Sequence, residues 1–309
     1  MRRVFAAFLT TILISISAIC GHRSARLIGG TEANFWRVTF ATGFLALWAF
    51  TFGQGLAGAG LPLFLISGLL GIGLGDVTYF QALPRLGPRL TLLLVQCLTA
   101  PFAALIEWLW LGTTLSLAQM LAGGVTLAGV ALALAPKEHI HLSARDRAIG
   151  LAAGVVAALG GAAGAVFSRK AYAVLAAANE TVDPATAGFQ RVLAGCIVSG
   201  VALLIVKRNM IRREVAEDAA APNATREKWR RVWFWIVLNS LAGQTLAVSC
   251  MQWAFETTPT GIVLPIVALS PIVVIPMSYM IDGERPSVRS LIGGLIGVAG
   301  VIALTMTRH

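Results

Sequence analysis

The chain has 309 residues, of which 57% are hydrophobic and only 12% are charged. Soluble domains contain about 45–50% apolar and about 25% charged residues, so this composition excludes an ordinary water-soluble globule. The net charge of +10 comes from basic residues scattered between apolar runs, without the continuous basic face that nucleic acid requires. We therefore expect a membrane protein with no nucleic-acid partner.

Long apolar runs predict the transmembrane helices, because a bilayer-spanning helix needs about 20 consecutive apolar residues. In chain order the runs are Val4–Cys20, Phe35–Phe52, Leu61–Leu83, Leu90–Leu111, Leu115–Ala135, Ala148–Phe167, Ala187–Val206, Trp233–Phe255, Gly261–Ile281 and Ser290–Met306. The first run also has the layout of a signal peptide, but Ile19 stands where cleavage requires a small residue. The sequence thus predicts an all-α, polytopic membrane protein with ten transmembrane helices.

The chain repeats itself once on either side of a polar linker. Gln81 and Pro88 match Gln252 and Pro259 at one constant spacing. Five helices in each half would make the second half enter the membrane from the opposite side, which gives the inverted repeats typical of transporters. The alternative is that apolar segments simply resemble one another. We predict a first repeat over 1–135, a linker over 136–147 and a second repeat over 148–309.

Polar residues inside the apolar runs are candidates for a substrate pathway. A carboxylate at the bilayer centre costs about 2.5–3.5 kcal/mol, so Asp76 must face polar partners, and both a proton-coupling and a structural role fit it. Ser240, Gln244 and Gln252 recur at multiples of four and trace one helix face. Each amide alone is equally typical of bonding between helices. The predicted set is Asp76, Tyr79, Gln81, Gln96, Asn239, Ser240, Gln244, Gln252 and Trp253.

Two prolines are candidate helix breaks. Pro101 in the fourth run and Pro271 in the ninth each remove one backbone hydrogen bond. Interrupted helices at corresponding places in two repeats indicate a central binding site, because freed carbonyls are tolerated only against protein or water. A packing kink is the alternative interpretation.

Three further charges lie inside the apolar runs. Arg37 and Arg191 stand near the start of the second and seventh runs, where we interpret them as side chains that extend to the membrane interface. Glu107 lies beside Trp108 and Trp110 and is interpreted as an interfacial acid in an aromatic belt. Glycine pairs four residues apart, such as Gly160 and Gly164, predict close helix packing.

Several motifs together resemble those of a known transporter superfamily. They are Tyr79-Phe80-Gln81-Ala82-Leu83 with Gly87-Pro88, then Pro101, then Asp282-Gly283-Glu284-Arg285-Pro286-Ser287 and Ile292-Gly293-Gly294. Over nearly the whole chain the sequence resembles the EamA-type drug/metabolite transporters. This resemblance implies two inverted EamA repeats, movement of small metabolites, and a cavity enclosed by helices 1, 3, 4, 6, 8 and 9. The glutamate after helix 9 is present as Glu284, whereas Thr113-Thr114 occupies the equivalent place after helix 4.

We therefore expect a multi-pass permease or exporter of a small organic metabolite in the cell (inner) membrane, working by alternating access. The sequence contains no P-loop and no paired cysteine or histidine motif, so we expect no direct use of ATP, no metal, no cofactor and no enzyme activity. The alternatives are a membrane scaffold and a lipid-modifying membrane enzyme. Substrate, direction, coupling to protons and oligomeric state stay open.

Membrane orientation is where the charge count and the resemblance disagree. The resemblance implies that both termini are cytoplasmic. That arrangement would place five Lys and Arg residues in the cytoplasm and 17 on the opposite side. The positive-inside rule therefore favours non-cytoplasmic termini.

Overall fold

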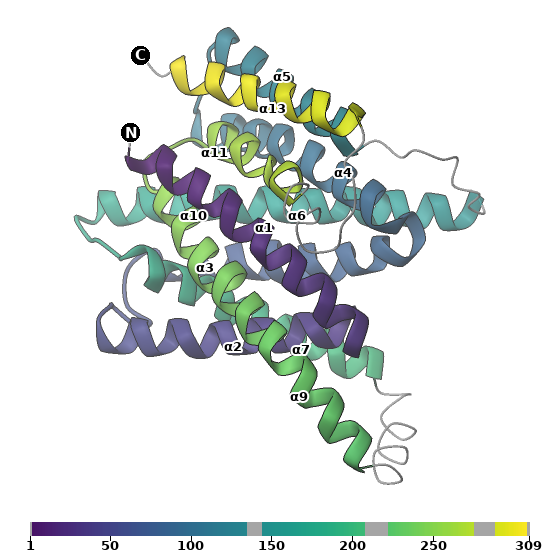
Figure 1. Cartoon of the computed structure of the whole chain (residues 1–309). Helices are drawn as coiled ribbons and strands as arrows, with labels where there is room; N and C mark the ends of the chain where they lie inside the picture. Colours follow the sequence, from purple (N-terminus) through teal and green to yellow (C-terminus); the bar gives the residue numbers. More distant parts are fainter. Residues whose placement is uncertain (1, 135–143, 208–221, 275–287, 308–309) are drawn as a thin grey trace.

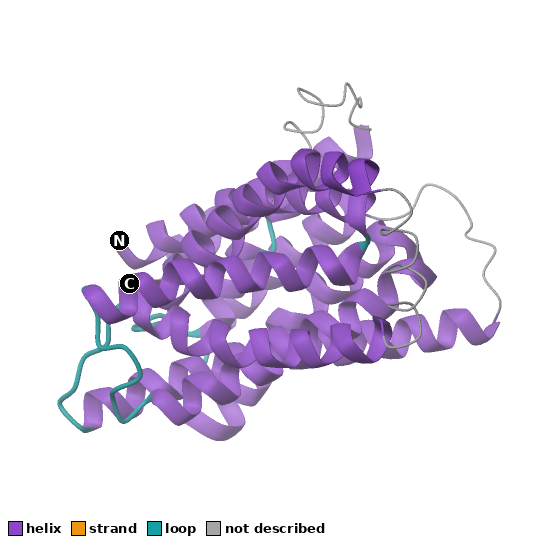
Figure 2. Cartoon of the chain, turned by 90° about the horizontal axis from the view of Figure 1, so that it is seen from below, coloured by secondary structure: helices purple, strands orange, loops and turns teal. Residues whose placement is uncertain are grey.

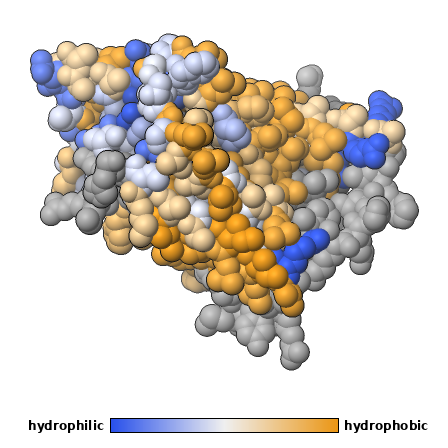
Figure 3. Space-filling model, turned by 90° about the horizontal axis from the view of Figure 1, so that it is seen from above, coloured by the Kyte–Doolittle hydropathy of each residue, from blue (hydrophilic) through white to orange (hydrophobic). Residues whose placement is uncertain are grey.

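The computed structural model describes residues 2–134, 144–207, 222–274 and 288–307. Within these ranges the chain is helical and contains no strand. The helices lie side by side in a bundle with both termini toward the same end (Figures 1 and 2). Hydrophobic residues cover most of the face seen in Figure 3, and hydrophilic residues gather toward its ends. Such a surface suits a lipid environment.

The first half of the chain folds into six helical elements. The π-helical segment η1 continues directly from α3 and leads into α4 without a loop. The bounds are α1 (Arg2–Ile28), α2 (Gly30–Thr51), α3 (Leu61–Gly68), η1 (Leu69–Leu74), α4 (Gly75–Leu111) and α5 (Leu117–Leu134).

The second half has the same kind of organisation, and its π-helical segment η2 links α9 to α10 without a loop. The bounds are α6 (Ala144–Ala177), α7 (Pro184–Lys207), α9 (Pro222–Asn239), η2 (Ser240–Ala247), α10 (Val248–Phe255), α11 (Thr260–Val267) and α13 (Val288–Met306).

Eight helices in the described residues are long and apolar enough to cross a membrane. Helix α2 is not among the eight, and Thr260–Val274 forms a shorter apolar helix. The prediction of an all-helical, multi-pass membrane protein is therefore confirmed. The number of ten spans stays a prediction, and the final part of the ninth run, after Val274, lies outside the described residues.

Helix α4 consists of two arms that run in opposite directions along α6. A Cβ atom added at Gly160 would lie 3.1 Å from Gly75, and one at Gly150 would lie 2.7 Å from Leu86, so the first arm is antiparallel to α6. Beyond the reversal the order is inverted, because Leu94 faces Gly154 and Ala103 packs with Ala162 further along α6. Figure 1 shows the two arms.

Helix ends follow local side-chain chemistry. Ser116 and Gln119 form a reciprocal capping box at the start of α5. The Ser116 N–H donates to Gln119 Oε1 at 3.0 Å, and the Gln119 N–H donates to Ser116 Oγ at 3.2 Å. Asp183 Oδ1 accepts the N–H groups of Ala185 and Thr186 at the start of α7. Gly112 ends α4 at a φ of 68°, a left-handed conformation that glycine adopts without strain.

Glycines allow close backbone contact at two helix interfaces. A Cβ atom at Gly164 of α6 would lie 2.9 Å from the Gly71 Cα in η1. Between α5 and α13, a Cβ atom at Gly129 would lie 2.2 Å from the Gly297 nitrogen. Close approach of this kind stabilises helix contacts in lipid, where no hydrophobic effect drives the helices together.

The two π-helical segments occupy corresponding places in the two halves. The spacing from Leu69, where η1 begins, to Ser240, where η2 begins, equals the spacing from Gln81 to Gln252. π-helical turns are rare and occur frequently at functional sites. The π-helical segments therefore indicate that the regions around η1 and η2 are candidates for a functional site.

Candidate functional site

Three helices contribute to a buried polar cluster, which we define as Ser67, Ser168 and Gln252. The Gln252 Nε2 atom of α10 donates to the Ser168 Oγ atom of α6 at 3.2 Å. The Ser168 and Ser67 hydroxyls lie 2.8 Å apart, and Ser67 of α3 donates to the Gly164 carbonyl at 2.5 Å. All three side chains are buried. The cluster thus connects the two halves of the chain through polar groups.

Polar side chains from Asn239 to Gln252 form a buried row through α9, η2 and α10. Asn239 Oδ1 accepts the Ser17 hydroxyl at 2.5 Å. Ser240 Oγ, Gln244 Oε1 and Gln252 Oε1 have no hydrogen-bond partner within the described residues. A buried polar atom without a partner costs about 1–3 kcal/mol. This row therefore holds unused hydrogen-bonding capacity inside the bundle.

Helix α1 binds to the second half through its hydroxyl groups. Thr11 donates to the Ile266 carbonyl at 3.0 Å, and Ser15 donates to the Ser270 carbonyl at 2.9 Å. These acceptors flank an interruption at residues 268–269, just before Pro271. The Val267 carbonyl, which Pro271 cannot engage, accepts the Ser270 hydroxyl at 2.5 Å.

The structure corrects the expected helix break at Pro101. Helix α4 continues through this residue to Leu111. A proline removes one hydrogen bond, and a transmembrane helix tolerates this loss where neighbouring groups satisfy the freed carbonyl. Pro101 is instead an exposed residue on the second arm of α4.

Arg37 and Asp76 form an ion pair between α2 and α4. The Arg37 Nη2 atom lies 3.1 Å from Asp76 Oδ2 and donates to Asn34 Oδ1 at 2.6 Å. The two charged side chains are 20% and 27% exposed, respectively. Asp76 therefore has the polar partner that its position in an apolar run requires.

Arg191 has a different environment, and its interpretation as an interfacial side chain is wrong. The residue is only 5% exposed and lies where α7 meets α3 and η1. A Cβ atom at Gly71 would lie 2.7 Å from the Arg191 Nη2 atom, and one at Gly68 would lie 1.8 Å from the Arg191 carbonyl oxygen. The Nε and Nη1 atoms have no hydrogen-bond partner within the described residues.

Glu107 is also buried, at 2% exposed, so its interpretation as an interfacial acid is wrong. Arg169 Nε lies 3.1 Å from Glu107 Oε1, and Glu107 Oε2 accepts the Thr260 N–H at 2.7 Å and the Thr260 hydroxyl. Arg169 also donates to the Phe255 carbonyl at 3.0 Å. These contacts join α4 of the first half to α6, α10 and α11 of the second.

The other predicted residues do not gather at one point. Gln81 is exposed, and its Oε1 atom accepts Arg85 at 3.1 Å. Tyr79, Gln96 and Trp253 are half-buried. The predicted serine and amide residues of α9, η2 and α10 thus lie along one buried row, while Gln81 is exposed on the first arm of α4.

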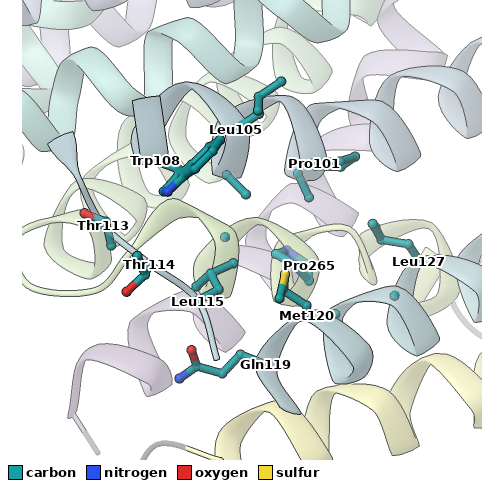
Figure 4. Close-up of a pocket in the computed structure, with 15 residues that line it drawn as sticks. Pro101, Leu105, Trp108, Thr113, Thr114, Leu115, Gln119, Met120, Leu127 and Pro265 are labelled. Carbon is teal, nitrogen blue, oxygen red and sulfur yellow. The ribbon is translucent and has the colours of Figure 1, made fainter. Parts of the chain in front are cut away.

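A cavity of about 580 Å³ lies between α4, α5 and α11 (Figure 4). Its lining is mostly apolar, with Leu105, Trp108, Met120 and Pro265 among its walls. The polar lining residues are Thr113, Thr114 and Gln119. Of the predicted pathway and helix-break residues, Pro101 alone lines this cavity, and none of the three residues of the polar cluster does.

Comparison with known proteins identifies the family. The sequence profile of the EamA-like transporter family matches residues 1–135 and 148–306. The chain belongs to this family. A solved structure titled "Crystal structure of protein" is 16% identical to this EamA chain, with a TM-score of 0.74 over 99% of this chain and 96% of the other. That likeness shows the fold alone. No curated protein matches the chain.

The sequence interpretation missed several residues of the site in this EamA protein. Ser67 and Ser168 give no distinctive sequence signal, because single serines are common in membrane helices. Arg169 follows the apolar run that ends at Phe167, yet α6 continues to Ala177 and Arg169 pairs with Glu107 inside the bundle. Glu284 and most of the 136–147 linker lie outside the described residues.

Proposed function

We propose that this EamA protein is a secondary transporter that moves a small organic metabolite across the cell membrane by alternating access. Ten helices would form two inverted repeats, over 1–135 and 148–309, that rock about a site between them. The two separate matches to the family profile and the corresponding places of η1 and η2 support this organisation.

The row of buried polar groups on α9, η2 and α10 carries the proposal. Ser240, Gln244 and Gln252 retain unmet hydrogen-bonding atoms inside the bundle. Nothing in helix packing requires these atoms to stay unmet, since apolar side chains would fill the same space at lower cost. A hydrogen-bonding solute that enters the bundle would satisfy them. A scaffold protein would gain nothing from such a row.

The interrupted helix at 260–274 supports the same site. Its backbone carbonyls at Ile266 and Ser270 accept hydroxyls of α1, so α1 of the first half contacts the break in the second. Discontinuous helices near the bilayer centre are a recurring feature of transporter sites. Movement of one half against the other would exchange these hydroxyl contacts.

Flux measurements in proteoliposomes test the proposal. Purified protein is reconstituted with a mixture of metabolites inside the vesicles, and mass spectrometry follows their release with and without a pH gradient. Selective movement of one compound, lost in the double variant S240A/Q244A, is the expected result. Absence of selective movement under all conditions would overturn the transporter and favour a scaffold.

The same assay decides between proton coupling through Asp76 and transport without an ion. The D76N variant keeps the size of the side chain but removes its charge. If transport is coupled through Asp76, the variant loses the response to the pH gradient. If flux and its pH dependence are unchanged in D76N, the carboxylate serves only to pair with Arg37.

Orientation is a separate proposal. The Lys and Arg count supports non-cytoplasmic termini, and both termini lie toward one end of the bundle (Figure 1). A cysteine introduced next to the C-terminal residue His309 would then react with a membrane-impermeant maleimide in intact cells. Labelling that requires cell lysis would reverse the orientation.

A further inference from the structure

The second half of the chain contains a buried arginine whose charge is not directly paired. Arg191 is 5% exposed, and among the described residues no carboxylate lies within 4.0 Å of its guanidinium. Its Nε and Nη1 atoms have no hydrogen-bond partner there. A charged group inside a membrane protein is costly and is found where it pairs with another group or meets a substrate.

Other described groups near Arg191 do not complete its hydrogen bonds. Asp76 exerts an electrostatic influence on Arg191, but its carboxylate is engaged by Arg37 at 3.1 Å. Two guanidinium groups therefore share one carboxylate. Glu107, a buried acid of α4, is paired with Arg169. The region around Arg191 thus carries an excess of about one positive charge.

The surroundings of Arg191 are those of the candidate site. Its Nη2 atom lies against Gly71 of η1, and Gly71 in turn faces Gly164, whose carbonyl accepts the Ser67 hydroxyl of the polar cluster. Gln252 of that cluster has an unpartnered Oε1 atom. The arginine therefore lies against a rare π-helical turn, and the glycine contact there leads to the neutral hydrogen-bonding groups of the polar cluster.

We propose that Arg191 binds an anionic group, a carboxylate or a phosphate, of the transported metabolite. This inference rests on the proposed transport function and specifies its substrate class. A guanidinium presents several N–H donors in a fixed plane that matches the oxygens of carboxylates and phosphates. The polar cluster would accept or donate bonds to the uncharged part of the same molecule.

Access of the anion requires α7 to separate from η1, because the guanidinium is enclosed in this conformation. At Arg191 itself the facing residues are the glycines Gly68 of α3 and Gly71 of η1, which place no side chain over the arginine. Further along the same interface the Ile72 side chain of η1 packs against Gly195 of α7, so the separation must also release that contact. The rocking movement of a transporter would provide it, and the described conformation would be one in which the site is closed.

Thermal unfolding of the purified full-length protein in detergent tests this inference. The probes are sodium lactate, its uncharged counterpart lactamide, and sodium phosphate, each titrated at constant ionic strength. Lactate or phosphate should raise the Tm of the wild-type protein, and lactamide should not. A rise in Tm with lactate alone would indicate a carboxylate site, and a rise with phosphate alone would indicate a phosphate site.

Variants assign the effect to Arg191. R191Q should weaken the apparent affinity for the active anion about tenfold or more, because it removes charge-assisted hydrogen bonds. R191K keeps the charge without the planar donors and should give an intermediate loss, and it replaces R191Q if that variant does not fold. R145Q, on the exposed start of α6, is the matched control and should bind like the wild type.

Three results would overturn the inference: equal effects of lactate and lactamide, equal anion affinity in wild type and R191Q, or no effect of either anion on the wild type. The flux assay separates this failure from failure of the proposed function. Selective flux of neutral or cationic compounds without anion binding would keep the transporter and remove the anion site. Anion binding that depends on Arg191, without any flux, would keep the anion site and remove the proposed transport function.

Discussion

Arg37 and Arg191 stand near the beginning of the second helix in each half, yet their surroundings differ. Arg37 pairs with Asp76. At the spacing that relates Gln81 to Gln252, the residue corresponding to Asp76 is Ala247. The second half therefore keeps the arginine but has no acid at that place, and Arg191 lies instead against η1 of the first half. The difference teaches that the arginine of the first half is neutralised by an ion pair, whereas that of the second half is buried with no directly paired acid among the described residues.

The largest effect is expected where the two halves meet. E107A removes the acceptor of Arg169 and of the Thr260 N–H, and it leaves Arg169, which is only 17% exposed, without its carboxylate partner. Loss of one member of a buried ion pair costs about 3–5 kcal/mol. Unfolding in detergent, followed by circular dichroism, should show this loss. D76A, whose side chain is partly exposed, should cost less, and an equal cost for both would contradict the assignment.

A smaller destabilisation is expected at the glycine contact beside Arg191. In G164A the new Cβ atom would lie 2.8 Å from the Ser67 carbonyl and 2.9 Å from the Gly71 Cα. Overpacking of this kind costs about 1–3 kcal/mol. G161A on the same helix is the control, because its Cβ atom would meet Thr99 at 3.5 Å, an ordinary contact. A Tm that falls equally in both variants would show that the contact is not specific.

Substitution should destabilise the protein at Arg37 but not at Arg191. R37Q leaves Asp76 without its ion pair and should lower stability by about 1 kcal/mol, since the pair is partly exposed. R191Q removes a charge without a direct partner and should leave stability unchanged or raise it. Chemical unfolding of both variants in one detergent gives the comparison. A larger loss in R191Q would mean that this arginine is held by contacts within the bundle.

The smallest effects are expected at the two corresponding glutamines. Q252A removes the bond to Ser168 and should lower stability by about 0.6 kcal/mol, a typical value for a hydrogen bond between membrane helices. Q81A affects an exposed side chain and should have no measurable effect on stability or flux. If Q81A reduced selective flux as much as Q252A, both halves would contribute equivalent residues to the pathway.

The sequence predicts most of the membrane helices from hydrophobic length, but it cannot place their polar residues. Gln81 and Gln252 occur in the same context, and only packing makes the first exposed and the second buried. In the sequence Arg169 follows an apolar run, as a residue beyond the end of a membrane helix would. In the structure α6 continues past it, and its Nε atom lies 3.1 Å from Oε1 of Glu107, which is distant in the chain. The charge state of a site depends on such long-range pairs, so a pattern of polar residues identifies candidates without assigning partners.

The π-helical segments also set how side chains could be redirected. Each residue of an α-helix adds a rotation of about 100°. If a π turn converted to regular α-helix, the part of the helix that follows the turn would rotate about its axis by about that angle. At η1 such a change would swing the first arm of α4, including Asp76, about its own axis while α3 stays in place. Arg37 would then lose its carboxylate without any tilt of α2. The rotation would be produced within the π-helical segment Leu69–Leu74, which contains two glycines.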